Sequence, residues 1–169
     1  MKSVIYLDTS LSGTVSSKDG YLSDTFQAGD DASNSNICAY ASFDTSEIPK
    51  ASVIESITLR IYQLTRVGDP YGKLGSLKAE KVTYSTLGIG ALGLQAAADA
   101  VISPSSSPSG GTKEVDVTTM VANDLKAGRT SQFRFCFPKP KASQDGIADS
   151  ATFAIAGTNR PNLNVAWHL

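Results

Sequence analysis

Asp30 and Asp31 form the densest acidic spot in the 169-residue sequence, and the polar run 33–36 follows them closely. Carboxylate, amide and hydroxyl oxygens are the ligands that Ca²⁺ prefers in proteins. The spacing is not that of an EF-hand, so a solvated turn is the competing interpretation. We therefore take Asp30 and Asp31 as candidate Ca²⁺ ligands, and Ca²⁺ is the one cofactor that the sequence suggests.

Tyrosines on the outward faces of strands would suit sugar binding, because an aromatic ring offers a flat apolar surface with a polar tip. Tyr40 and Tyr62 lie in alternating segments, at positions that face away from the expected core. Outward tyrosines can equally pack across strands or contact another subunit. Tyr40 and Tyr62 are therefore candidate ligand-binding or interface residues, and the sequence does not choose between these roles.

Patterns that would indicate catalysis are few. His168 is the only histidine, so a histidine-rich metal site is ruled out by count, and we expect this lone, outward histidine to be solvated rather than part of a Ser-His-Asp triad. Residues 88–93 read G-x-G-x-x-G, with Asp116 further on, but a dinucleotide fold needs several βαβ units that this sequence lacks. We expect 88–93 to be a small-residue loop or short helix packed against the main fold. Hydrolysis by paired carboxylates needs only two acids and stays open, yet we expect no enzyme.

The charge balance points away from nucleic acid and membranes as partners. Formal net charge is −1, and the 15 Lys and Arg residues are scattered, whereas both partners call for a basic patch. No apolar run is long enough to cross a bilayer. Residues 1–8 lack the apolar region and cleavage site of a signal peptide. We expect a protein made and used without export; a leader already removed is the alternative.

Cys38 and Cys136 are the only cysteines. Two cysteines so far apart do not make the disulfide framework of a small secreted protein. Neither lies at metal-ligand spacing from another ligand. We expect free thiols in strands, with an internal disulfide and an intersubunit disulfide as alternatives.

Period-two alternation of apolar and polar residues dominates the chain. In 53–62 the apolar Ile57, Leu59 and Ile61 share one face, and polar residues occupy the other. Such alternation is typical of an antiparallel sheet with one buried face. The same pattern recurs in 37–43, 133–137 and 163–169.

One helix is expected at Met120–Ala127, with Thr118 or Thr119 as its N-cap and Gly128 at its end. The Ser/Pro-rich stretch 103–111 is too polar to pack. Because too few strands flank it to form two domains, we interpret it as a surface loop. The sequence therefore predicts one all-β domain over 1–169, an antiparallel jelly-roll-like β-sandwich with one short helix.

Four segments together resemble the DNRLRE family of β-sandwich domains. In that family a strand ending in Phe-Asp is followed by an Ile-Pro turn and a long strand, as in 39–49 and 53–62. Residues 115–121 resemble its "VDVT" entry into a short helix, and 159–165 resemble its closing strand. The resemblance implies a jelly-roll-like sandwich of the kind found in surface and carbohydrate-associated proteins.

Two functional classes follow from these observations. The leading prediction is a structural subunit of a virion surface, such as a phage capsid decoration, neck or tail accessory protein, whose partners are copies of itself or other subunits. In that case residues 1–8 and 103–112 are expected to contact a neighbour. The alternative is an extracellular carbohydrate-binding module of a secreted protein, with glycans as its partners.

Overall fold

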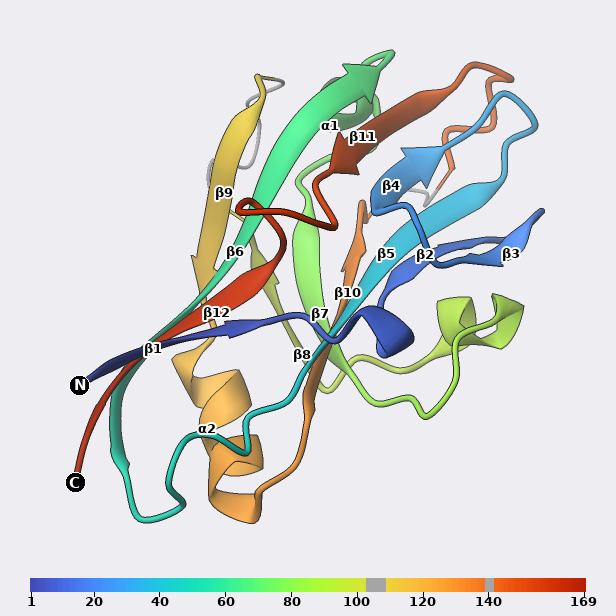
Figure 1. The fold of residues 1–169 in the computed structure, drawn as a ribbon. Helices are drawn as coiled ribbons and strands as arrows, with labels where there is room; N and C mark the ends of the chain where they lie inside the picture. The colour runs from blue at the N-terminus through green and yellow to red at the C-terminus, as the bar shows by residue number, and fades with distance from the viewer. Residues whose placement is uncertain (103–108, 139–141) are drawn as a thin grey trace.

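The computed structural model describes residues 1–102, 109–138 and 142–169, and its regular structure is chiefly β (Figure 1). The strands are β1 (Lys2–Tyr6), β2 (Gly13–Ser16), β3 (Gly20–Leu22), β4 (Gln27–Asp30), β5 (Asn36–Phe43), β6 (Val53–Val67), β7 (Lys78–Val82), β8 (Ala98–Val101), β9 (Gly111–Asp116), β10 (Ser131–Cys136), β11 (Asp149–Phe153) and β12 (Asn162–His168). The helices are α1 (Pro70–Lys73) and α2 (Thr118–Ala127), with 3₁₀ turns η1 (Thr9–Leu11) and η2 (Ile89–Gly93).

The twelve strands form one antiparallel sheet that curls over on itself, in the order β1-β12-β6-β11-β4-β5-β10-β7-β8. β9 pairs with β6, β2 pairs with β5, and β3 pairs with β2. The long strand β6 carries β12 on its first half and β11 on its second, and β11 leads through β4 to the other wall. The predicted all-β antiparallel fold is confirmed, and α2 is the only helix longer than one turn among the described residues.

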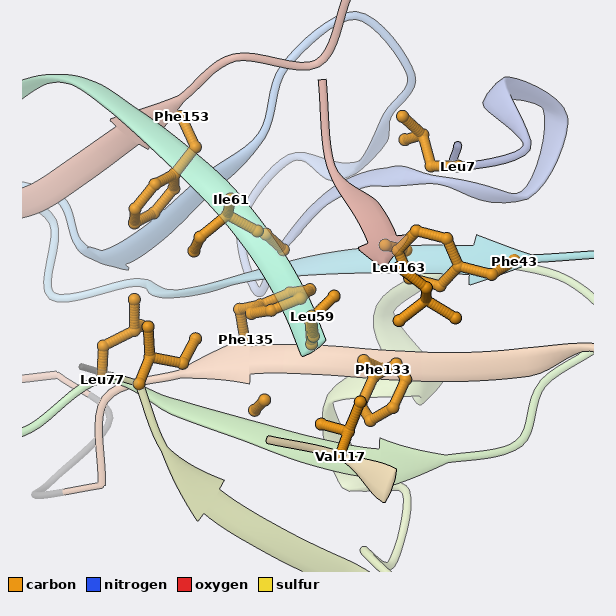
Figure 2. Close-up of a cluster of buried hydrophobic side chains, with 14 of the residues drawn as sticks. Leu7, Phe43, Leu59, Ile61, Leu77, Val117, Phe133, Phe135, Phe153 and Leu163 are labelled. Atoms are coloured by element: carbon orange, nitrogen blue, oxygen red, sulfur yellow. The ribbon is translucent and has the colours of Figure 1, made fainter. Parts of the chain in front are cut away.

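The main core lies between the two walls of the curled sheet. Figure 2 shows Leu59 and Ile61 of β6 directed toward Phe133 and Phe135 of β10. All four side chains are at most 1% exposed, as the alternation in 53–62 and 133–137 predicts. Burial of a large apolar side chain of this kind stabilises the fold by about 1.5–3 kcal/mol. This face of the sheet therefore holds the fold together.

Helix α2 forms where the sequence predicts it and ends at Gly128, whose φ of 64° is left-handed. Its N-terminal contact differs from the prediction, because Asp116 Oδ1 accepts the hydrogen bond from the backbone N–H of Thr118 at 2.8 Å. The Thr118 hydroxyl instead accepts a hydrogen bond from the N–H of Ile57 at 2.8 Å, which ties the helix to β6. Val121 and Leu125 are buried against the core.

The expectation of free thiols is wrong, because Cys38 and Cys136 form a disulfide with their Cα atoms 5.1 Å apart. The register pairs Ala39 of β5 with Phe135 of β10, so the two cysteines lie opposite each other on neighbouring strands. Sequence spacing could not reveal this, because 98 positions separate the cysteines and only the strand pairing brings them together.

Tyr40 lies on the predicted face of β5 but is wholly buried, so its assignment as an exposed ligand or interface residue is wrong. A second apolar cluster covers this outer face, and Tyr40 packs edge-to-face on Tyr84 with ring centroids 5.7 Å apart. Burial raises the pKa of the Tyr40 phenol to about 12. The buried members of this cluster are Val15, Cys38, Tyr40, Val82, Tyr84, Ala91 and Cys136.

The structure describes the whole of one of the two segments expected to contact a neighbouring subunit, 1–8, and only part of the other, 103–112. β1, which makes up most of 1–8, pairs with β12 of the same chain from Lys2↔Ala166 to Tyr6↔Asn162. Ile5 at its end is buried in the main core. Most of the 103–112 stretch lies outside the described residues, although β9 begins at Gly111. Among the residues that the structure does describe, no helix combines the length and apolar character needed to span a bilayer.

Candidate functional site

The outward face of β1, β12, β6 and β9 is mostly polar. These four strands lie side by side in Figure 1, in the order β1-β12-β6-β9. Alternation directs their apolar residues to the core and their polar residues outward. The register places Tyr6, Asn162, Arg60 and Glu114 in one row across the strands, and Val4, Asn164, Thr58 and Asp116 in the next.

Two adjoining hollows of about 210 and 340 Å³ follow this face, and both are lined by Val4, Arg60 and Asn164. We call them together the outer-face groove. Its first hollow is bounded by two tyrosines, and its second runs toward the chain termini. The further lining residues of the first hollow are Tyr6, Tyr62, Thr112, Thr158, Asn159 and Asn162; those of the second are Lys2, Ser3, Ser56, Thr58, Glu114, Val165 and Ala166.

Hydrogen-bonding groups with solvent access are concentrated in the groove. Arg60 donates from Nε and Nη2 to Glu114 Oε2 at 3.3 and 3.2 Å, and both side chains are nearly half exposed. An ion pair this exposed contributes little to stability, so its donors and acceptor are free to exchange with a ligand. Asn164 donates from Nδ2 to Asn162 Oδ1 at 2.6 Å, which fixes the orientation of two amides in the same hollow.

Tyr62 lies in the groove, on the outward face where the sequence places it. Tyr6 also lines the groove and is 41% exposed, and the Arg160 guanidinium stacks on its ring 3.7 Å from the centroid. The groove thus brings two aromatic rings together with amide and guanidinium donors. Sequence analysis missed Tyr6, Arg60 and Asn164, although the alternation in 53–62 and 163–169 already placed the last two on the outward face.

The predicted Ca²⁺ ligands separate in the structure. The buried Asp30, at the end of β4, lies next to Asp145 and Asp149, and one carboxylate oxygen from each falls within 4.8 Å of the others. Asp31 instead accepts hydrogen bonds at Oδ1 from the N–H groups of Ser33 and Ser35, both at 2.9 Å. Asp31 therefore closes its own turn, as the competing interpretation proposed, and Asp30 belongs to a different cluster.

Lys73 of α1 joins this cluster, which we call the acidic pocket (Asp30, Lys73, Asp145 and Asp149). Its Nζ lies 3.0 Å from Asp145 Oδ2 and 3.5 Å from Asp149 Oδ2. Hydrogen bonds from the Ser143 hydroxyl and the Ile147 N–H, together with Lys73, lower the pKa of Asp145 to about 2. The neighbouring carboxylates raise the pKa of Lys73, Asp145 first among them.

The glycine-rich stretch 88–93 forms the short 3₁₀ turn η2, as expected for a small-residue segment packed on the main fold. A nucleotide-binding loop needs glycine where a ligand or backbone approaches closely. Here a Cβ added at Gly88, Gly90 or Gly93 would meet nothing within 4 Å. Arg134 holds the segment in place, donating from Nη1 to the carbonyls of 91, 92 and 94 at 2.9–3.2 Å.

His168 is exposed, as the alternation of the last strand predicts. Its Nδ1 lies 2.8 Å from Glu55 Oε1, and both side chains are 54% exposed. A pair this open to water is expected to contribute little to stability. It lies outside the residues that line the outer-face groove.

No protein-family model matches the chain, and no curated protein matches it either. The resemblance to DNRLRE domains therefore stays a prediction.

Proposed function

We propose that this chain is a carbohydrate-binding domain that holds a polysaccharide in the outer-face groove. One observation carries the proposal. Tyr6, Asn162, Arg60 and Glu114 lie in a single row across four strands, with Tyr62 and Asn164 beside them. Rings, amides and an exposed ion pair are thus presented side by side on a rigid sheet.

Sugar hydroxyls both donate and accept hydrogen bonds, and the groove offers both kinds of partner. The amide of Asn164 carries donors and an acceptor, Arg60 donates in a planar fork, and Glu114 accepts. The apolar faces of sugar rings suit an aromatic surface such as Tyr62. Because the two hollows join at Val4, Arg60 and Asn164, the groove fits an extended chain better than a small enclosed ligand.

The disulfide supports the extracellular setting that accompanies this function. Disulfides persist in oxidising compartments and are uncommon in the reducing cytosol of mesophiles. The Cys38–Cys136 bond is buried within the second apolar cluster, as expected for a structural crosslink. This favours the carbohydrate-binding alternative over a subunit that assembles inside the cell.

If the chain is instead a virion subunit, we expect it to form a defined oligomer that does not bind sugars. One of its two proposed contact segments, β1, is already paired within the chain along Lys2–Tyr6. Most of the other, 103–112, lies outside the described residues. No feature of the described ranges favours that prediction over the groove, so the groove defines the first experiment.

Native gels cast with soluble polysaccharides, neutral and uronic-acid-containing, test the proposal. We expect at least one of them to retard the wild-type protein. Arg60→Ala and Tyr62→Ala should each weaken that binding about tenfold, the effect of losing 1.4 kcal/mol of contact energy. Arg66→Ala is the matched control, because Arg66 lies on the same strand with similar exposure but outside the groove.

Two results would overturn the proposal. One is a panel in which no polysaccharide retards the wild-type protein. The other is retardation that Arg60→Ala and Tyr62→Ala leave unchanged, since binding would then lie elsewhere. Far-UV circular dichroism of each variant checks that the fold is intact, as expected for substitutions at partly exposed positions.

A further inference from the structure

The acidic pocket concentrates negative charge at a place where the backbone is fixed. Asp30 and Asp149 face each other across the β4–β11 pairing, and both are 0% exposed. Asp145 approaches them from the loop before β11, with its side chain one-third exposed. Buried carboxylates are costly unless a cation or hydrogen-bond donors compensate them. The pocket therefore needs a positive charge.

Hydrogen bonds satisfy Asp30 but not all of Asp149. Asp30 accepts from the N–H of Asp149 at Oδ1 and from the N–H and hydroxyl of Ser143 at Oδ2. Asp149 Oδ1 accepts from the N–H of Asp69 at 2.8 Å. Asp149 Oδ2, however, is buried and receives no hydrogen bond. A buried carboxylate oxygen that receives no hydrogen bond, in a pocket lined by other carboxylate oxygens, is a position that a metal ion can complete.

The Ser143 hydroxyl lies between two of the pocket's carboxylates. Its Oγ lies 2.9 Å from Asp30 Oδ2 and 2.7 Å from Asp145 Oδ1. A hydroxyl carries one proton and can donate to only one of these oxygens at a time. The N–H groups of Ser143 and Ile147 also donate to these two oxygens, so Asp149 Oδ2 is the carboxylate oxygen of the pocket that receives no hydrogen bond.

Lys73 supplies the only positive charge that the structure places against Asp145 and Asp149 within the described ranges. Its contact with Asp149 Oδ2 is long, at 3.5 Å, and its side chain is 39% exposed. Lys73 lies at the end of the four-residue helix α1, so its flexible stem can turn toward water. The ammonium is thus a weak and displaceable partner for the buried oxygen.

We propose that the acidic pocket binds one Ca²⁺ ion, held by Asp30, Asp145 and Asp149, which displaces the Lys73 ammonium. Three carboxylates and the Ser143 hydroxyl supply part of the six to eight oxygen ligands of Ca²⁺, and water supplies the rest. Mg²⁺ requires a tighter octahedron and gives up its water reluctantly, so we expect it to bind less well. The ion would join β4, β11 and the loop between 142 and 148, and it would not touch the outer-face groove.

Thermal unfolding of the full chain, freed of metal beforehand, tests this site. We expect 1 mM CaCl₂ to raise the melting temperature by about 5 °C relative to 1 mM EDTA, as for a ligand at about 100 times its Kd. MgCl₂ at the same concentration should give a smaller rise. Calorimetric titration with CaCl₂ should show about one ion per chain, the stoichiometry of a single site.

Variants show whether the ion occupies the proposed place. Asp145→Asn, at the surface of the pocket, should abolish the Ca²⁺-dependent rise. Asp31→Asn is the matched control and should keep it, because Asp31 lies outside the cluster. Lys73→Met should lower the half-saturating Ca²⁺ concentration about tenfold, since one competing positive charge is removed, a change of 1.4 kcal/mol.

Equal melting temperatures in CaCl₂ and EDTA, for both the wild type and Lys73→Met, would overturn the proposal and leave Lys73 as the permanent cation. A rise that survives in Asp145→Asn would also overturn it, because Ca²⁺ would then bind elsewhere. Neither result would affect polysaccharide retardation by the groove, so the two proposals fail separately.

Discussion

Reduction of the Cys38–Cys136 disulfide should lower the free energy of unfolding by about 3–4 kcal/mol. The bond joins residues 98 positions apart, so breaking it restores much of the chain entropy of the unfolded state. The chain-entropy estimate for a loop of this length is about 4.7 kcal/mol, and measured values are usually smaller. Urea unfolding followed by tryptophan fluorescence, with and without reductant, measures the difference.

The double variant Cys38→Ala, Cys136→Ala is the control for this experiment. Both sulfurs are buried, so reductant reaches the bond only when the surrounding structure opens. The variant never forms the bond, so its free energy of unfolding should match that of the reduced wild type. Added reductant should leave the free energy of unfolding of the variant unchanged. Equal stability of oxidised and reduced wild-type protein would contradict a structural role for the disulfide.

The second large effect is expected at Arg134, whose side chain is only 3% exposed. It donates to both carboxylate oxygens of Glu80, at 3.0 and 3.1 Å, and to three carbonyls at the end of η2. Arg134→Met leaves Glu80 without its partner and removes the donor from those carbonyls. We expect a loss of about 3–5 kcal/mol in the free energy of unfolding, as for other buried ion pairs broken on one side.

A double-mutant cycle separates the charge from the packing. Adding Glu80→Leu to Arg134→Met removes the uncompensated carboxylate, so it should recover part of the lost stability. The carbonyls of η2 would still lack their donor, so full recovery is not expected. Urea unfolding of the wild type, both single variants and the double variant gives the cycle. A loss below about 1 kcal/mol for Arg134→Met would contradict the buried-pair argument.

Local patterns predicted the faces of the strands but not what covers them. The alternation in 53–62 correctly directs Ile57, Leu59 and Ile61 inward, because the period of a strand fixes which residues share a face. The same reasoning put Tyr40 on the face away from the main core, which is also correct. The expectation that Tyr40 is exposed was wrong, because the chain around Tyr84 and η2 folds back over that face. Periodicity shows which residues share a face of a strand, but it does not show whether another segment of the chain packs over that face.

The candidate sites depend on pairings between distant segments. Asp30 meets Asp149 only because β4 pairs with β11, 119 positions later. Asp31, its neighbour in the sequence, points into its own turn instead. Acidic residues adjacent in sequence are thus a poor guide to a metal site when they end a strand, where successive side chains diverge. The sequence predicted the outer-face groove better than the acidic pocket, because alternation alone identified Tyr62 as an outward residue.

Titration of ¹⁵N-labelled protein with a short oligosaccharide from the retarding polysaccharide tests the central claim most directly. The groove account predicts that the largest amide shift changes fall in β1, β12, the first half of β6, and β9. These strands carry the residues that line the groove. Largest changes around Thr83–Leu94, where a separate hollow lies beside the second apolar cluster, would contradict it. So would a spectrum that the oligosaccharide leaves unchanged.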